Sequence, residues 1–248
     1  MRRLPEIELN NGLRIPILYE DRAVLAIDKP RHWMLVPFTW QRTNRNLQAA
    51  ITSSIAARDF WARSRNLKYL HYVHRLDADT TGVLLFAKST GALRTLSDLF
   101  EDRRMDKCYL AVVSGIPKRS EWTCDLRIAP DERRIGRMRA SLHGKDAETS
   151  FRLLETRGAL SLLEARPVTG RTHQIRIHLT QTGYPIVGDD LYGRAEDRQR
   201  FQLGLRAVSL AYTDPFTRRR VGIEAPTKAF LAEYGFGPEV QPGQQVVA

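Results

Sequence analysis

Apolar and polar positions alternate in short blocks along the chain, and these blocks predict both strands and helices. Residues 17 to 30 show two apolar runs on either side of Glu20-Asp21, which is the pattern of a β-hairpin. Residues 69 to 88 predict a strand, a polar loop and a second strand, because the small polar residues of DADTTG suit a tight turn. Asp77 begins this loop. A carboxylate at a strand end is a common place for a catalytic acid, although an isolated Asp more often bonds its own turn.

Apolar residues recur at helical spacing in several segments. These segments are residues 46 to 65, residues 92 to 105 with Ser89 or Thr90 as the cap, residues 171 to 182, and the short stretch 227 to 235. In the third segment Gly183 stands at the C-terminal end, with Pro185 beyond it. Ile175, Leu179 and Thr182 are spaced to face inward there.

Further strands are predicted in the second half of the chain. They cover residues 107 to 115, 121 to 128, 148 to 156 and 160 to 168, followed by two strands around Asp214-Pro215 within residues 203 to 226. No internal repeat and no Pro- or Gly-rich linker divides the chain. We therefore expect an arm at residues 1 to 16, one catalytic domain at 17 to 235, and a flexible tail at 236 to 248.

The charge of the chain points to a polyanionic partner. Its 248 residues include 39 Lys and Arg against 28 Asp and Glu, a formal charge of +11 with a pI near 10.0. A chain this basic is expected to bind the phosphates of nucleic acids. The basic loop 131 to 146, which includes Arg133, Arg134 and Lys145, is predicted to contact them. Trp61 and its neighbouring arginines can stack on RNA, but the favoured interpretation is a core aromatic beside a solvated face.

Other classes of protein lack support in the sequence. Cys108 and Cys124 have no metal-ligand spacing and are expected to be buried, reduced thiols. The histidine pairs His71/His74 and His173/His178 are poorly spaced for one metal ion. No cofactor fingerprint, membrane-spanning run or signal peptide is visible. We expect a cytoplasmic protein without metal or cofactor, and a monomer by default.

The string HRLDADTTG followed by LLFAK resembles the catalytic motif of the RluA-type family of RNA pseudouridine synthases. The family pattern is HRLD, two free positions, T-S-G and later AK, with Thr81 here in place of Ser. The resemblance implies that Asp77 is the catalytic residue and that Arg75 helps to flip the target uridine. It assigns His74 and Leu76 to the substrate pocket.

Two later motifs agree in order and spacing. KCYLAVVSG resembles the Lys-x-Tyr motif of the family, which assigns a catalytic tyrosine to Tyr109. RPVTGRTHQIRIHLTQTGYPIVGDDLYG resembles TGR-(S/T)-HQIR-x-H followed by G-x-P-I-x-GD-x-x-YG. The resemblance makes Arg176 the active-site arginine that pairs with the catalytic Asp. Arg171, His173 and Lys145, the last from the similar string GKDAET, are assigned to substrate binding.

The chain departs from the family pattern in two places. After Lys29-Pro30 the family usually has a Gly and then a Val-His pair, whereas this chain has RHWMLVPF. Arg206 replaces the usual His before Ala near the closing motif. Many relatives carry an N-terminal S4-type domain, and none is expected here because few residues precede Ile17.

The resemblance implies an α+β pseudouridine synthase fold, with a long mixed, mostly antiparallel sheet flanked by helices and a central catalytic cleft. It implies isomerisation of uridine in structured RNA, ribosomal or transfer, with attack on the sugar, attack on the base and a glycal route all open. An ion pair with Arg176 would keep Asp77 ionised and aimed. The alternatives are a catalytically silent RNA-binding or folding factor on the same scaffold, and an Asp-nucleophile hydrolase acting on another anionic substrate.

Overall fold

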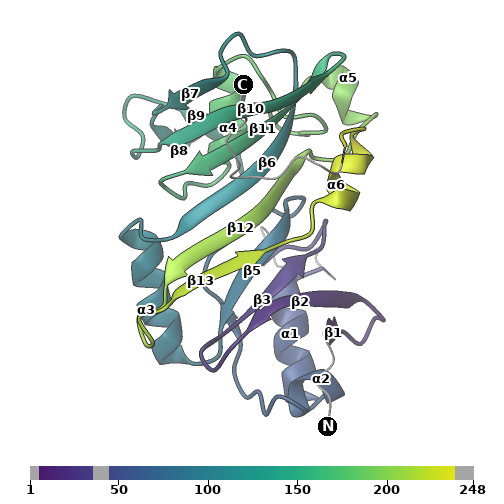
Figure 1. Ribbon diagram of the computed structural model, residues 1–248, viewed down its shortest axis with the longest axis vertical. Helices are drawn as coiled ribbons and strands as arrows, with labels where there is room; N and C mark the ends of the chain where they lie inside the picture. The colour runs from purple at the N-terminus through teal and green to yellow at the C-terminus, as the bar shows by residue number, and fades with distance from the viewer. Residues whose placement is uncertain (1–5, 36–44, 238–248) are drawn as a thin grey trace. The chain divides into compact units, whose positions relative to one another are not determined.

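The computed structural model describes residues 6 to 35 and 45 to 237 of the chain (Figure 1). The chain divides into two compact units, each formed from two stretches of sequence. Unit 1 comprises residues 1 to 105 and 209 to 225, and unit 2 comprises residues 106 to 208 and 226 to 248. Each unit is described by itself below, and the boundaries of the predicted catalytic domain, arm and tail stay predictions. Most of the predicted tail lies outside the described residues.

Unit 1 is built on an antiparallel sheet. Its strands are β1 (Glu6–Glu8), β2 (Arg14–Glu20), β3 (Val24–Lys29) and β5 (Thr81–Ala87), in that order, with the short β4 (His71–Tyr72) also paired to β5. β12 (Leu205–Thr213) follows β5 and pairs with β13 (Arg220–Glu224). The predicted hairpin around Glu20-Asp21 is confirmed, and the Asp21 carboxylate closes its turn by accepting the N–H groups of Ala23 and Val24.

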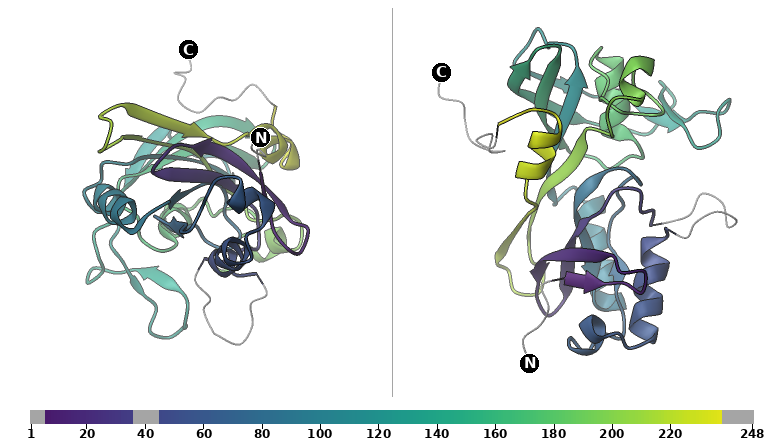
Figure 2. Two further views of the ribbon diagram at one scale, coloured as in Figure 1. Left: turned by 90° about the horizontal axis from the view of Figure 1, so that it is seen from below. Right: turned by 90° about the vertical axis from the view of Figure 1, so that its right-hand side faces the viewer.

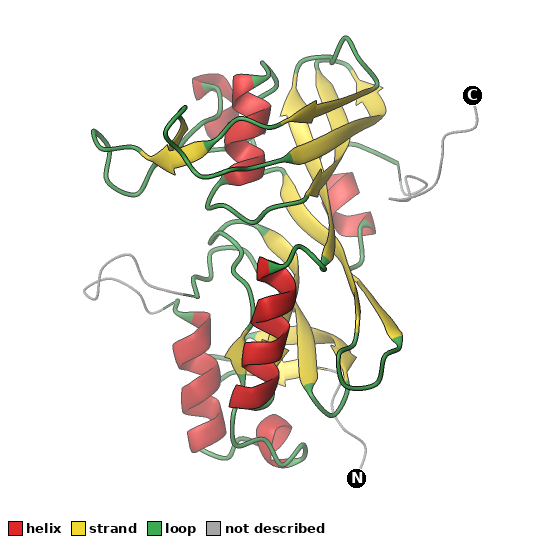
Figure 3. Ribbon diagram, turned by 90° about the vertical axis from the view of Figure 1, so that its left-hand side faces the viewer, coloured by secondary structure: helices red, strands yellow, loops and turns green. Residues whose placement is uncertain are grey.

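Helices lie on one side of this sheet (Figure 3). They are α1 (Leu47–Ala56), α2 (Phe60–Arg63) and α3 (Thr90–Glu101). Ser89 is the N-cap of α3, as predicted, and its side chain accepts a hydrogen bond from the Ala92 N–H. Leu96 and Leu99 of α3 pack against Val83 and Leu85 of β5 in the core of the unit. The burial of these leucines follows from their spacing on one helix face.

The prediction of one helix across residues 46 to 65 was wrong in its extent. Helix α1 ends at Ala56, Arg58 has a left-handed φ of 57°, and α2 begins after Asp59. The break allows Trp61 to fold back into the core, where it is 1% exposed and donates its indole N–H to Ser54. The core interpretation of Trp61 is therefore confirmed.

Unit 2 contains a second group of strands around α4 (Gln174–Gln181). Their order is β6 (Asp106–Ser114), β11 (Leu160–Pro167), β10 (Thr149–Arg157) and β7 (Glu121–Cys124), with antiparallel pairing from β6 through to β7. Two short helices, α5 (Ala195–Arg198) and α6 (Lys228–Glu233), complete the unit. Ile175 and Leu179 of α4 pack on the sheet, as predicted, together with Leu163 and Phe151.

The basic segment 131 to 146 is not the open loop that the sequence predicted. It contains β9 (Met138–Ala140), which pairs with β8 (Ile128–Pro130) to form a separate two-stranded hairpin. Ile128, Ala147 and the α4 residue Ile177 make a small core that seats this hairpin on the helix. Figure 2 shows its loop extending away from the body of unit 2.

The α+β class of the fold is confirmed by a large mixed sheet with few flanking helices. Cys108 and Cys124 are free and buried, as expected. Burial raises the pKa of the Cys108 thiol to about 12, and Glu164 adds to this rise. Within the described residues, no helix is both long and apolar enough to cross a membrane.

Candidate active site

Asp77 lies in the loop between β4 and β5 in unit 1, at the first position of a tight turn. Its carbonyl accepts the Thr80 N–H at 3.2 Å, so Ala78 and Asp79 are the two central residues of the turn. Asp77 is half-buried, Arg75 is exposed and Leu76 is 8% exposed. Asp77 lies in the polar loop between two strands, as predicted, but β4 ends at Tyr72, five residues before it, so the prediction of a strand-end position was wrong.

The His74 side chain contacts strand β5 and helix α3. Its Nε2 accepts the N–H of Leu85 at 3.2 Å, and its ring stacks on Phe100 of α3 at 4.7 Å between centroids. An acceptor Nε2 requires the neutral imidazole with its proton on Nδ1. These contacts are structural, so a substrate-binding role for His74 stays a prediction.

Lys29 is a buried cation beneath the Asp77 loop that sequence reasoning did not assign to the site. The residue is 0% exposed, and its Nζ donates to the carbonyls of Pro30 at 3.0 Å, Ala78 at 2.7 Å and Thr80 at 3.0 Å. Burial lowers its pKa to about 7, while the charges of Asp79 and Asp77 oppose this change. Three carbonyl acceptors match the three N–H donors of an ammonium group. Lys29 therefore ties the end of β3 to the loop that carries Asp77.

Lys29→Met should change how the stability of the protein depends on pH. The folded-state pKa of Lys29, about 7, lies below its unfolded value of 10.5, so the unfolded chain binds more protons between these values. The free energy of unfolding of the native protein should therefore rise relative to that of Lys29→Met as pH rises from 6.5 to about 9. Urea unfolding of both proteins across this range is the measurement. A stability difference that stays constant with pH would show that Lys29 does not titrate there.

Tyr109 lies on β6 in unit 2, half-buried and opposite Ala165 of β11. Two residues earlier on the same strand, Lys107 donates from Nζ to the carbonyls of Thr169 at 2.8 Å and Val168 at 3.4 Å. Burial, followed by the charge of Arg171, lowers the pKa of Lys107 to about 8. Lys107 thus fastens the strand of Tyr109 to the segment that leads into α4.

Gln174 organises the turn at the start of α4. Its Oε1 accepts from the Thr169 hydroxyl at 2.7 Å and the Arg171 N–H at 2.9 Å. Its Nε2 donates to the Glu148 carbonyl and the Thr149 hydroxyl, both at 2.9 Å. The side chain is 4% exposed, so these bonds satisfy a buried amide on both sides. The HQIR string therefore stabilises the local fold through Gln174 and also contains Arg176.

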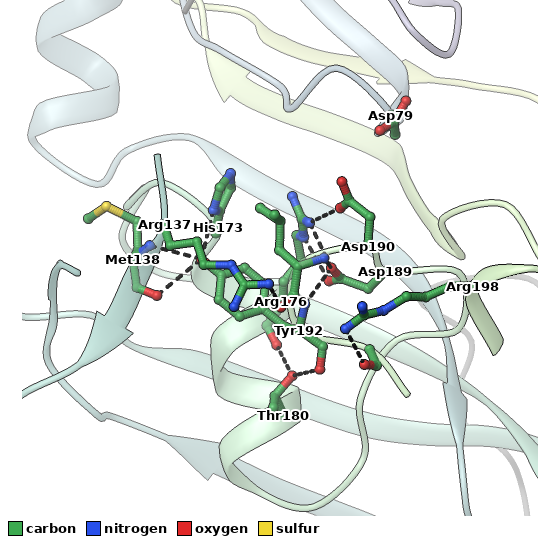
Figure 4. Close-up of polar contacts among 12 residues, drawn as sticks. Asp79, Arg137, Met138, His173, Arg176, Thr180, Asp189, Asp190, Tyr192 and Arg198 are labelled. Carbon is green, nitrogen blue, oxygen red and sulfur yellow. Dashed lines mark hydrogen bonds and ion pairs between the residues drawn. The ribbon is translucent and has the colours of Figure 1, made fainter. Parts of the chain in front are cut away.

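Arg176 is buried on α4 and paired with Asp189. Its Nε and Nη2 donate to the two carboxylate oxygens of Asp189, each at 2.7 Å, and Nη2 also reaches Asp190 at 3.1 Å (Figure 4). Asp189 also accepts the N–H groups of Leu191 and Tyr192 at 2.9 Å. Burial acts to raise the pKa of Asp189, but the bonds from Arg176 and these N–H groups lower it below its usual value. This two-bond geometry fixes the plane of the guanidinium group.

Tyr192 connects Arg176 to the basic hairpin (Figure 4). Its hydroxyl donates to the carbonyl of Met138 at 3.1 Å, accepts the N–H of Met138 at 2.9 Å and lies 2.9 Å from His173 Nδ1. The guanidinium carbons of Arg137 and Arg176 lie 5.7 and 5.3 Å from the centre of the Tyr192 ring. The hairpin β8–β9 is therefore joined through one aromatic ring to the start of α4.

The remaining predicted substrate-binding residues lie at the surface of unit 2. Lys145 is exposed, and Arg171 donates from Nε to the Asp146 carbonyl at 2.8 Å. His173 precedes α4 with a left-handed φ of 57°. Such a backbone is unusual for a residue with a side chain and marks a position that its surroundings hold in place.

The predicted site residues are divided between the two units. Unit 1 carries the HRLD motif, and unit 2 carries Tyr109 and Arg176, so the predicted ion pair between Asp77 and Arg176 stays a prediction. Sequence reasoning did not assign Lys29, Lys107, Gln174, Asp189 and Tyr192. The GD-x-x-YG string contains two of them and was the signal available for Asp189 and Tyr192.

Arg206, the departure from the family pattern near the closing motif, has a structural role. It is 7% exposed and donates from Nε to the Pro226 carbonyl at 3.0 Å. In the described part of the chain, no group of three or more His, Cys, Asp or Glu side chains is placed to hold a metal ion. The His178 ring nitrogens instead contact the Thr149 hydroxyl and the Leu126 carbonyl.

Comparison with known proteins identifies the family of this chain. The family model described as RNA pseudouridylate synthase matches residues 23 to 181. Ribosomal large subunit pseudouridine synthase C of Escherichia coli strain K12 is 36% identical over 239 residues, covering 90% of this chain and 69% of the relative. The Vibrio cholerae protein of the same name is 34% identical over 227 residues, covering 88% and 67%. The solved structure of human RNA pseudouridylate synthase domain containing 1 has a TM-score of 0.70 at 25% identity, covering 88% of this chain and 85% of that one.

These findings define an isomerase that acts on RNA. The chain belongs to the RluA-type family of RNA pseudouridine synthases, and the recognition drawn from its three motifs is confirmed. Its activity is the conversion of uridine to pseudouridine in RNA. Neither the silent factor nor the hydrolase receives support from any of these comparisons.

Proposed function

We propose that this chain isomerises uridine in large-subunit ribosomal RNA, with Asp77 as its catalytic carboxylate. The observation that carries the choice of RNA is the 36% identity, over 90% of the chain, to a relative named as a ribosomal large subunit pseudouridine synthase. The formal charge of +11 suits an RNA substrate, because each phosphate contact replaces a condensed counterion. Transfer RNA is the alternative substrate.

The reaction breaks the bond from the ribose to N1 of uracil, turns the base and rejoins it through C5, from which a proton is then lost. In this proposal Asp77 acts on the sugar or the base, and Arg176 pairs with its carboxylate. Asp189 supports Arg176, since two bonds of 2.7 Å hold its guanidinium group in one orientation. Tyr109 stacks on the uracil ring and assists removal of the C5 proton.

The target uridine must leave the RNA stack to reach such a site. Arg75 is exposed on the Asp77 loop and takes the space of the extruded nucleotide, while Leu76 and His74 line the pocket. Arg171, His173 and Lys145 bind the RNA from unit 2. The protein acts as a cytoplasmic monomer without a metal or cofactor, as a reaction with no net redox change allows.

Mapping pseudouridines in total RNA from cells with and without this protein tests the proposed substrate. The proposal predicts that one or a few pseudouridines disappear from large-subunit ribosomal RNA when the protein is absent, and that expression of the protein restores them. Loss confined to transfer RNA would overturn the choice of RNA. An unchanged map of both RNAs would overturn the proposed function.

The double variant Arg133→Ala/Arg134→Ala should bind RNA more weakly. Both side chains are exposed on the β8–β9 hairpin. If each contacts a phosphate, the slope of log affinity against log salt should fall by about 1 for each lost contact. Binding titrations at several salt concentrations measure this slope.

The matched control is Arg218→Ala/Arg219→Ala, which removes the same charge from the exposed turn between β12 and β13. An equal loss of slope in both double variants would show that only the overall charge matters. The hairpin would then have no particular role in binding.

A further inference from the structure

The turn that carries Asp77 is held from the end of β3. Ala78 and Asp79 are its two central residues, because the Thr80 N–H bonds back to the Asp77 carbonyl. Lys29 fixes the backbone of this turn through the carbonyls of Ala78 and Thr80. The side chain of Asp79 is held by a different residue of the segment that follows Lys29.

That residue is His32, whose Nδ1 lies 2.7 Å from Asp79 Oδ1. The side chains of His32 and Asp79 are 49% and 39% exposed. Ion pairs and hydrogen bonds between groups this exposed add little to stability. The contact is therefore poorly explained as a means of holding the fold together.

The backbone of His32 makes the contact more unusual. Its φ is 66°, in the left-handed region that glycine adopts freely and that a side chain disfavours. This is the short segment after Lys29-Pro30 in which the RluA-type pattern has a glycine. A glycine would fit the same backbone but would have no side chain to reach Asp79. His32 thus has an unfavourable backbone conformation, and its side chain makes one contact, with Asp79 in the turn that carries Asp77.

We propose that His32 is a positioning residue for Asp77. Its ring holds the Asp79 side chain while Lys29 holds the turn backbone, so both central residues of the turn are fixed from one segment. The Asp77 carboxylate is thereby kept in its reactive position when the uridine enters. The inference rests on the proposed catalytic role of Asp77, and it matters because small misplacements of a reacting group are costly.

His32→Gly tests the proposal, since it removes the ring and keeps a residue suited to the left-handed backbone. We expect kcat for pseudouridine formation to fall about tenfold, below the roughly 100-fold cost of a 1 Å misplacement. KM, RNA affinity and Tm should stay near their native values. Asp79→Ala should give the same loss, and the double variant should be no worse than either single one.

Two further variants separate positioning from a general effect on folding. His32→Asn should recover most of kcat, because asparagine tolerates a left-handed backbone and its amide can donate to Asp79. The matched control is Asn66→Gly, which changes another exposed left-handed residue of unit 1, with φ 54°, and should leave kcat unchanged.

Native kcat in His32→Gly would overturn the inference, and so would losses that add in the double variant. An equal loss of kcat in Asn66→Gly would also overturn it. Asp77→Asn, measured in parallel, separates this outcome from failure of the proposed function. Full activity of Asp77→Asn would remove the catalytic role of Asp77 and this inference with it. Inactive Asp77→Asn beside fully active His32→Gly would overturn the inference alone.

Discussion

Asp77→Asn should abolish pseudouridine formation and leave RNA binding intact. The substitution keeps the shape of the side chain and removes the negative charge that the proposed chemistry uses. Loss of a catalytic side chain reduces turnover by on the order of 10⁴- to 10⁶-fold. The turn around Asp77 should survive, because its bonds from Lys29 and Thr80 involve backbone carbonyls.

Chromatography of nucleosides from digested RNA, after single-turnover reaction, measures the pseudouridine formed. A filter-binding titration with the same RNA measures affinity. Asp98→Asn on the exposed side of α3 is the matched control and should behave as the native protein. Appreciable turnover by Asp77→Asn would show that another residue attacks the substrate.

Asp189→Ala should have the largest effect on stability among single substitutions in the site. It leaves the guanidinium group of Arg176, whose side chain is only 6% exposed, without its two shortest bonds. Removing one partner of a buried ion pair costs about 3–5 kcal/mol, and the bond to the exposed Asp190 compensates the Arg176 charge only weakly. Arg176 also loses its fixed orientation, so isomerisation by the folded fraction should fall as well. Urea unfolding and single-turnover assays below the transition measure the two effects.

Asp190→Ala is the matched control for that experiment. Asp190 contacts the same guanidinium group at 3.1 Å, but its side chain is 71% exposed. An exposed pair of this kind contributes about 0–1 kcal/mol. Equal stability of the two alanine variants would contradict the account of Arg176 as a residue oriented by Asp189.

Local sequence patterns were sufficient for most of the individual elements. The apolar run of β5, the Ser89 cap of α3 and the turn at Asp21 follow from side chains close in sequence. The break between α1 and α2 was missed because residues 46 to 65 keep helical periodicity throughout. Burial of Trp61 against Ser54 decides the geometry there, and periodicity does not report such a contact.

In the candidate site too, sequence motifs located the predicted residues, whereas contacts between residues far apart in the sequence became visible only in the structure. Motifs placed Asp77, Tyr109 and Arg176 on a loop, a strand and a helix, and the structure agrees for each. The roles of Lys29 and Lys107 depend on which carbonyls face their ammonium groups after folding. The residues that follow them in the sequence, Pro30 and Cys108, do not indicate which carbonyl groups the two lysines contact. Residues 36 to 44, part of the atypical segment after Lys29-Pro30, lie outside the described residues.

The sequence did not identify Asp189 as a partner of Arg176. The family resemblance pairs this arginine with the catalytic Asp, and that prediction remains. The structure adds Asp189, which stands 13 residues later in the chain and meets Arg176 through two charged hydrogen bonds. Both aspartates of GDD precede a tyrosine in one short string, and only burial distinguishes the 0% exposed Asp189 from its exposed neighbour.

Release of tritium from ribosomal RNA labelled at C5 of uridine tests the central claim most directly. Rejoining the base through C5 displaces the hydrogen at that atom, so each pseudouridine formed should release one tritium to water. The purified protein is predicted to release tritium from large-subunit ribosomal RNA in proportion to pseudouridine formed. Tight binding of the labelled RNA with no tritium released would contradict the claim and indicate a silent RNA-binding protein.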